Sequence, residues 1–171
     1  MLATDTIAPA LSVPLLGGGT FDLASATPDA FTLVVFYRGL HCPLCTRQME
    51  EDVIPSLPGL GKLGVDVVVI SMDDEGRATE QASGWTEEGL RGSYGLPEAT
   101  ARAWGLYISK GRPDTREPAY FSEPGMTVVR GDGRVFAHWQ QSVPFARPKL
   151  AELVGGLSYV VENDYPARGT A

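Results

Sequence analysis

Residues 31–45 read FTLVVFYRGLHCPLC and join two local patterns. The run Phe31–Tyr37 is continuous in β-branched and aromatic residues, which is typical of a strand buried on both faces of a sheet. A helix is predicted directly after it, over about Pro43–Asp52, because proline is tolerated in a first turn and good helix formers follow. The stretch therefore predicts a buried strand that runs straight into a helix.

A second buried strand follows at Val65–Ser71, which reads VDVVVIS. Pro55 and Pro58 are expected to end or kink the helix between the two strands, because proline removes a backbone donor. The order strand, helix, strand predicts a βαβ unit with parallel pairing and hence an α/β fold.

Other segments give weaker local signals. We expect an N-terminal β-hairpin around Gly17–Gly19, a hairpin of Met126–Val129 with Arg134–Gln140, and a long loop over Ser109–Gly125. We expect short helices near Gly76–Trp85, capped by Asp73 or Asp74, and at Glu98–Trp104. A closing amphipathic helix is predicted at Arg147–Asn163, with an apolar stripe of Leu150, Leu153, Val154, Leu157 and Val161.

Length and composition indicate one globular domain spanning residues 1–171. Hydrophobic residues make up 43% and charged residues 20%, which is an ordinary globular composition. The formal charge of −7 disfavours binding to nucleic acid or to an anionic membrane. No apolar run approaches a membrane span, and Met1–Thr6 lacks the positive region of a signal peptide, so a cytoplasmic location is expected.

The two cysteines, Cys42 and Cys45, form a CxxC motif at the predicted junction of strand and helix. Cys42 would face the free N–H groups and the positive dipole of the helix start, which lower the pKa of a thiol. Cys45 would lie one turn further on the same face, close enough to form a disulfide. This placement predicts a nucleophile, Cys42, and a resolving thiol, Cys45.

Two other interpretations of the cysteines stay open: buried thiols without chemistry, or part of a zinc site. Zinc usually takes four ligands, and only His41 and His138 remain as nitrogen donors. Arg38 and His41 could add positive charge beside Cys42, or could serve only as a solvated strand end and a linker.

Four stretches together resemble the peroxiredoxin-like branch of the thioredoxin-fold superfamily, the alkyl hydroperoxide reductase/thiol-specific antioxidant family. They are the N-terminal hairpin, FTLVVFYRGLHCPLC, VDVVVIS and SEPGMTVVRGDGRVFAHW, and the resemblance covers about Leu11–Leu157. It implies an α/β thioredoxin-like fold, in which a central mixed β-sheet is flanked by helices on both faces and preceded by an N-terminal β-hairpin.

The resemblance also implies that Pro124 is a cis-proline that faces the CxxC motif. Some helper residues depart from the family pattern. Gly39 stands where peroxiredoxins carry a hydroxyl residue, and the arginine expected near Pro124 is absent. His41 and Phe36 stand where thioredoxins have a tryptophan and a buried acid.

The expected function is that of a thiol-dependent antioxidant oxidoreductase that reduces peroxides with Cys42 and Cys45. A thioredoxin-like disulfide reductase and a non-catalytic binding domain remain as alternatives. No bound cofactor is required, because the cysteine pair holds the electrons, and an external thiol reductant of the thioredoxin or glutathione type must restore it. A homodimer is compatible with the resemblance.

Overall fold

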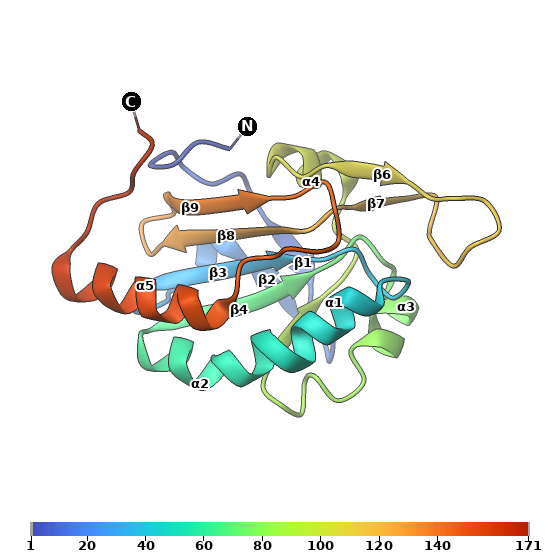
Figure 1. The fold of residues 1–171 in the computed structure, drawn as a ribbon, viewed down its shortest axis with the longest axis horizontal. Coiled ribbons are helices and arrows are strands. Elements are labelled where there is room, and N and C mark those ends of the chain that lie inside the picture. Colours follow the sequence, from blue (N-terminus) through green and yellow to red (C-terminus); the bar gives the residue numbers. More distant parts are fainter. Residues whose placement is uncertain (1, 171) are drawn as a thin grey trace.

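A five-stranded sheet with the strand order β5–β4–β3–β8–β9 forms the centre of the molecule (Figure 1). The computed structural model describes residues 2–170. In chain order the helices and strands are β1 (Ser12–Pro14), β2 (Thr20–Asp22), β3 (Phe31–Phe36), α1 (Pro43–Gln48), α2 (Ile54–Lys62), β4 (Val65–Ile70), α3 (Glu75–Gln81), β5 (Arg91–Ser93), α4 (Glu98–Ala103), β6 (Ile108–Lys110), β7 (Tyr120–Ser122), β8 (Gly125–Arg130), β9 (Val135–Gln140) and α5 (Leu150–Asn163).

The strand β3 is the middle of this sheet, and all of its residues are buried. It pairs in parallel with β4, where Phe31 faces Val65 and Phe36 faces Ile70. On its other side it pairs antiparallel with β8, so the sheet is mixed. The predicted buried strand and the parallel βαβ unit are both confirmed.

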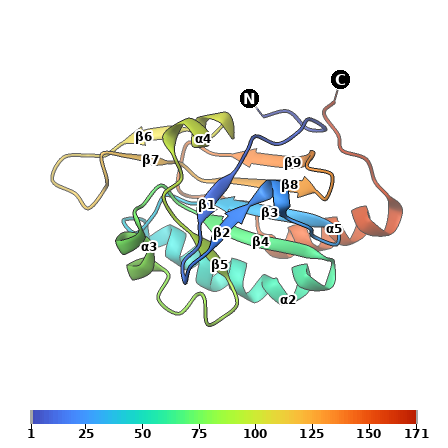
Figure 2. The same ribbon diagram turned by 180° about the vertical axis from the view of Figure 1, so that it is seen from behind.

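The alternating side chains of β3 point into two separate cores. Leu33 and Val35 lie in the core under α1, α2 and α5, whereas Val34 and Phe36 pack with Trp104 and the N-terminal hairpin β1–β2. Figure 1 shows α1, α2 and α5 on one side of the sheet. Figure 2 shows the hairpin β1–β2 and α4 on the opposite side. Helices on both faces and an N-terminal hairpin were expected, and both are confirmed.

The helix that follows Cys42 does not end at its prolines, so of the two predicted outcomes, an end or a kink, the end is wrong. A π-helical turn at Met49–Val53 joins α1 directly to α2, which continues to Lys62. Such a turn shifts the register of the backbone hydrogen bonds, and Pro55 then lies at the start of α2, where a missing N–H is tolerated. Pro58 lies inside α2, which keeps its helical path while Leu60 is buried against the sheet.

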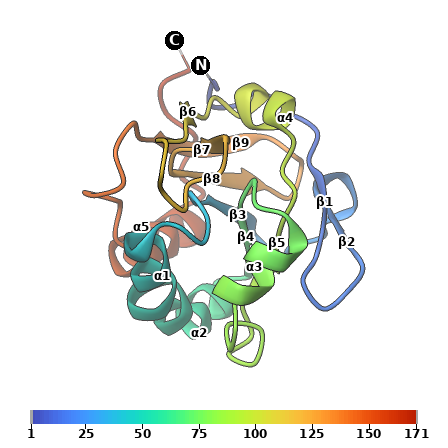
Figure 3. The same cartoon turned by 90° about the vertical axis from the view of Figure 1, so that its right-hand side faces the viewer.

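The segment expected as a long loop, Ser109–Gly125, contains a hairpin, in which two short strands enclose a loop of residues 111–119. β6 pairs antiparallel with β7, so that Ile108 faces Ser122 and Lys110 faces Tyr120. Phe121 and Ser122 of β7 are buried, which stabilises the hairpin. The Pro, Gly and Arg residues of the segment made this strand hard to recognise from the sequence. Figure 3 looks onto the end of the molecule where this hairpin, α1 and α3 come together.

The closing helix begins later than predicted, at Leu150 rather than Arg147. Leu150 and Leu157 are buried as expected, but Val161 is 46% exposed and Val160 packs on the core instead. Residues 147–149 lie outside the helix, and Arg147 lies against Gln48 of α1.

The hairpin β8–β9 and the short helix α4 lie where they were predicted. The helix expected near Gly76–Trp85 is shorter, because α3 ends at Gln81, and its cap is Asp74. Within the described residues, no helix has both the length and the apolar character needed to cross a membrane.

Candidate active site

A short loop, residues 37–42, leads from the end of β3 to α1 and is fixed at three backbone positions. Tyr37 N–H donates to the Ile70 carbonyl at 3.0 Å, which extends the pairing of β3 with β4. Leu40 N–H donates to Asp73 Oδ2 at 2.7 Å, and Cys42 N–H donates to the Gly39 carbonyl at 3.0 Å. The loop therefore places Cys42 at the start of α1.

Gly39 and Asp73 fit together closely in this loop. Gly39 has φ +113°, a conformation that residues with a Cβ rarely adopt. The Asp73 carboxylate occupies the space where a side chain at position 39 would begin. Asp73 also accepts a hydrogen bond from Arg77 Nε at 2.8 Å, whereas Asp74 caps α3. Asp73 is thus an anchor of the loop and not the helix cap.

Both cysteines are free and buried, and they lie one helical turn apart. A hydrogen bond from the Cys45 thiol lowers the pKa of Cys42 most, although burial opposes it. The Cys45 backbone N–H and the charges of Arg147 and Arg38 lower it further, to about 6. Burial and the hydrogen bond to Cys42 raise the pKa of Cys45 well above its ordinary value. At neutral pH the pair therefore holds one negative charge, centred on Cys42.

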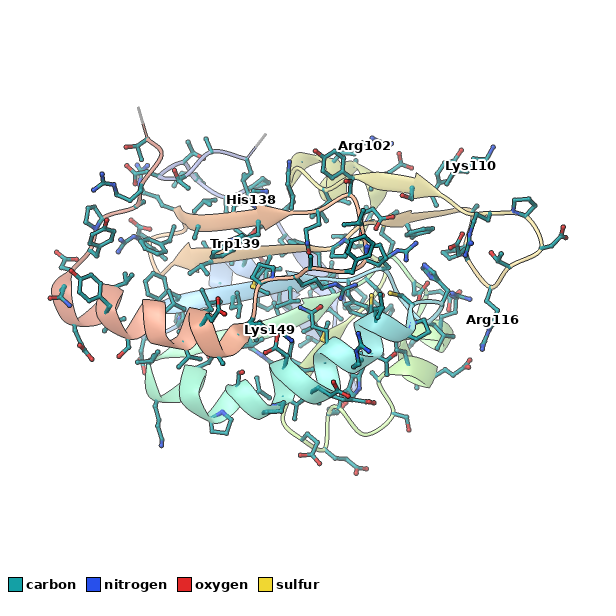
Figure 4. All side chains as sticks on the ribbon, in the orientation of Figure 1. Arg102, Lys110, Arg116, His138, Trp139 and Lys149 are labelled. Carbon is teal, nitrogen blue, oxygen red and sulfur yellow. The ribbon has the colours of Figure 1, made fainter. Side chains whose placement is uncertain are left out.

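Arg147 contacts both sulfurs. Its Nη2 lies 3.1 Å from Cys45 Sγ and 3.8 Å from Cys42 Sγ. Its Nη1 donates to Gln48 Oε1, and its Nε donates to the Pro144 carbonyl at 3.0 Å. The residue lies in the segment between β9 and α5, and Figure 4 shows the nearby Lys149 just ahead of α5.

Arg38 turns away from the sulfurs towards the β6–β7 hairpin. Its guanidinium lies 3.4 Å from Glu123 and 3.7 Å from Glu117, over the ring of Phe121 at 4.7 Å. Its charge is the smallest of the effects that lower the pKa of Cys42. Two carboxylates already balance this arginine, which limits its influence on the thiolate.

His41 does not supply positive charge, which was one of the two roles that the sequence left open for it. Burial, reinforced by the charge of Arg38, lowers the pKa of His41 to about 4, so the ring is neutral at neutral pH. The imidazole packs against the ring of Phe121 in a tilted arrangement, with the ring centroids 4.5 Å apart. Neither ring nitrogen has a hydrogen-bond partner among residues 2–170.

Pro124 follows a trans peptide bond, since residues 2–170 contain no cis peptide bond. The expected cis-proline is therefore wrong. The Pro124 carbonyl accepts a hydrogen bond from Gln141 N–H at 3.0 Å, which continues the β8–β9 pairing by one step. Pro124 lines a small cavity together with Arg147 and Trp139, and neither cysteine is among the residues that line it.

The residues around the CxxC motif do not build a metal site. In the part of the chain that the structure describes, no three His, Cys, Asp or Glu side chains are grouped to hold a metal ion. The zinc interpretation of the cysteines thus gains no ligand set from the fold.

The sequence model of the redoxin family matches residues 2–150. The chain belongs to the redoxin family. The peroxiredoxin-like resemblance inferred from the sequence is thereby confirmed. None of the curated protein sequences compared with this redoxin matches it significantly.

Solved peroxiredoxin structures share the fold of this redoxin at low sequence identity. Peroxidoxin BcpB from Mycobacterium tuberculosis superposes with a TM-score of 0.73 at 14% identity, over 94% of this chain and 99% of that one. Reduced Prx3 from Vibrio vulnificus, in complex with H₂O₂, gives 0.75 at 14% identity, over 92% and 99%. AhpC from Enterococcus faecalis gives 0.73 at 13% identity, over 96% and 98%.

Two residues of the redoxin site were not found from the sequence. Arg147 lies 102 residues from Cys45, and no local motif marks it. Asp73 carried a usable signal, because it lies three residues after the end of β4, the parallel neighbour of β3, but a helix cap was the interpretation drawn from the sequence. Parallel strands bring their carboxyl ends to one edge of a sheet, which places Asp73 beside the loop that holds Cys42.

Proposed function

We propose that this redoxin is a thiol peroxidase in which Cys42 is the nucleophile and Cys45 is the resolving thiol. The observation that carries the proposal is the placement of Cys42 at the start of α1, with its pKa lowered to about 6. A thiol with that pKa is mostly thiolate at neutral pH, and the thiolate is the reactive form.

The proposed reaction has two steps. The Cys42 thiolate attacks one oxygen of a hydroperoxide, an S–O bond forms, the O–O bond breaks, and the alkoxide takes a proton from solvent to leave as an alcohol. Cys45 then attacks the Cys42 sulfenic acid, an S–S bond forms, and the departing hydroxide takes the Cys45 proton and leaves as water. The peroxide is reduced by two electrons and the cysteine pair is oxidised by two.

A reductant must return the disulfide to two thiols. Two electrons and two protons from an external dithiol or from two monothiols complete the cycle, so we assign a thioredoxin- or glutathione-type reductant as partner. We also propose a cytoplasmic location, where such reductants keep cysteine pairs reduced. The homodimer is a separate proposal, and light scattering of the reduced protein tests it.

Three residues support the pair in this proposal. Arg38 adds a small electrostatic stabilisation of the Cys42 thiolate. His41 packs on Phe121 as a neutral ring and shapes the loop beside Cys42. Pro124 forms one wall of the small cavity that Arg147 also lines.

The disulfide-reductase alternative has less support. A protein disulfide must reach the attacking sulfur, whereas Cys42 is only 2% exposed, and the expected cis-proline that would present a backbone to such a substrate is absent from residues 2–170. A non-catalytic binding domain does not need a thiolate, so the lowered pKa of Cys42 favours an enzyme. A small hydroperoxide is the substrate class that fits a buried thiolate best.

The test is stopped-flow loss of thiols in the reduced protein after a stoichiometric organic hydroperoxide is added at neutral pH. We expect oxidation much faster than that of a free thiol, and its loss in Cys42→Ser. Oxidation at the rate of a free thiol, together with rapid reduction of insulin disulfides, would move the assignment to the reductase.

A further inference from the structure

Arg147 differs from the other arginines near the site in what it pairs with. Arg38, Arg77, Arg112 and Arg116 each lie within ion-pair distance of a carboxylate. Within residues 2–170, no carboxylate oxygen lies that close to Arg147. Its donors meet an amide oxygen, a carbonyl oxygen and the two sulfurs.

This arrangement is costly unless a sulfur carries the missing negative charge. Arginine stays protonated under all ordinary conditions, and a half-buried cation without an anion is unfavourable. The guanidinium lies nearer to Cys45 Sγ than to Cys42 Sγ, at 3.1 Å against 3.8 Å. In the reduced pair, however, the charge is centred on Cys42 and not on Cys45.

The segment that carries Arg147 is held at both ends, which keeps this geometry. Gln141 Nε2 donates to the carbonyls of Phe145 and Ala146, at 3.1 and 2.7 Å. Leu150 N–H donates to the Asp52 carboxylate at 3.1 Å, which fixes the start of α5 to the helix that follows Cys45. Gln48, on α1 itself, holds the other guanidinium nitrogen. Arg147 therefore keeps its position relative to the CxxC motif.

We propose that Arg147 is the catalytic residue of the resolving step, where it stabilises the Cys45 thiolate that attacks the oxidised Cys42. This inference rests on the proposed function. Once Cys42 becomes a sulfenic acid, it carries no negative charge. The Cys42 thiolate that accepted a hydrogen bond from the Cys45 thiol is then gone. The Cys45 proton then leaves to the departing hydroxide, and the charge that appears on Cys45 Sγ lies beside Arg147 Nη2. The S–S bond forms, the S–O bond breaks, and water is released.

The experiment compares the two steps in one turnover with Arg147→Gln and Arg147→Lys. Thiolate absorbance and dimedone trapping follow sulfenic acid formation, and loss of the second thiol follows disulfide formation. We expect Arg147→Gln to slow disulfide formation by about 10- to 100-fold and to let the sulfenic acid accumulate, with a much smaller change in the first step. Arg147→Lys, which keeps the charge, should recover part of the rate. Arg47→Gln, an exposed arginine on α1, is the matched control.

A second measurement needs no peroxide and separates this inference from the proposed function. In Cys42→Ser, the pKa of Cys45 is followed through its rate of alkylation by iodoacetamide. Adding Arg147→Gln should raise that pKa by about one unit, a tenfold loss of thiolate. An unchanged pKa of Cys45, or a slowing confined to the peroxide step, would overturn the role of Arg147 in resolution. Failure of the wild type to outpace a free thiol would overturn the peroxidase alone.

Discussion

The Asp73 carboxylate lies directly against the backbone of Gly39, in the space that any side chain at position 39 would need. The same carboxylate accepts the Leu40 N–H at 2.7 Å. Gly39 is the residue three before Cys42, where the family resemblance implies a hydroxyl. In this chain that position is filled by the Asp73 carboxylate, which comes from the segment after β4. The reactive loop is therefore held from outside and not by a side chain of its own.

Gly39→Thr should therefore weaken the protein and fail to improve catalysis. A β-branched residue at φ +113° is strained and meets Asp73, which costs about 1–3 kcal/mol or more in the free energy of unfolding. Thermal unfolding and stopped-flow peroxide kinetics check both parts. Gly61→Ala is the control, because that exposed helical position has open space, and the change should stabilise by up to about 1 kcal/mol. A stable and faster Gly39→Thr variant would contradict the role given to Asp73.

Asp73→Ala should loosen the loop that carries Cys42. The change leaves the Leu40 N–H and Arg77 Nε without their acceptor, which costs about 1–3 kcal/mol in the free energy of unfolding. We also expect the pKa of Cys42 to rise towards its ordinary value, because the hydrogen bonds around its sulfur are less well held. Iodoacetamide alkylation against pH measures that pKa.

The neighbouring aspartate provides the comparison for that experiment. Asp74→Ala removes the cap of α3, since Asp74 Oδ1 accepts the Arg77 N–H at 3.0 Å, and should cost about 1 kcal/mol in stability. Asp74→Ala should leave the pH dependence of Cys42 alkylation unchanged. Equal pH profiles for the two variants would show that Asp73 acts on stability alone.

Cys45→Ala should raise the pKa of Cys42 more than Arg147→Gln does. The hydrogen bond from the Cys45 thiol is the largest effect that lowers the pKa of Cys42, and the charge of Arg147 is a smaller one. In the wild type, the rate of the first peroxide step should rise as pH rises through about 6 and level off near neutrality, because the thiolate is the reactive form. In Cys45→Ala the same rise should move to higher pH. An unchanged pH profile would mean that the helix start and the arginines are enough to lower the pKa of Cys42 without Cys45.

His41 should not titrate near neutral pH, and the pKa of His138 should lie below its ordinary value. Burial lowers the pKa of His41 to about 4, and burial also lowers the pKa of His138. The chain has only these two histidines, so their ring resonances in NMR spectra between pH 5 and 8 can be assigned with His41→Gln and His138→Gln. Constant shifts for His41 over this range are expected. A midpoint near 6.5 for His41 would restore it as a positive charge beside Cys42.

The sequence was sufficient for the cysteine pair and for the strands β3, β4, β8 and β9 of the central sheet, whereas the short edge strand β5 was missed. A run of buried strand residues followed by Pro43 and a CxxC motif forces Cys42 to the start of a helix, because both patterns are local. The same locality explains the errors. Pro55 and Pro58 favour a helix end when taken alone, but a π-helical turn and the burial of Leu60 carry the helix past them. The β6–β7 hairpin was hidden because only Phe121 and its neighbours are buried.

What only the tertiary structure decided is which distant groups surround the sulfurs. Asp73 arrives through the parallel pairing of β3 with β4, and Arg147 arrives through the path of the chain from β9 to α5. The sequence also did not reveal the charge of His41, because burial in the folded protein lowers its pKa. Nor did it reveal the backbone geometry of Pro124, whose carbonyl accepts a hydrogen bond from the distant Gln141. Short-range patterns predict the strand and the helix of this site, whereas the loop between them is held by Ile70 and Asp73 from the neighbouring chain segment. Its electrostatics depend on contacts across some hundred residues, which no local pattern encodes.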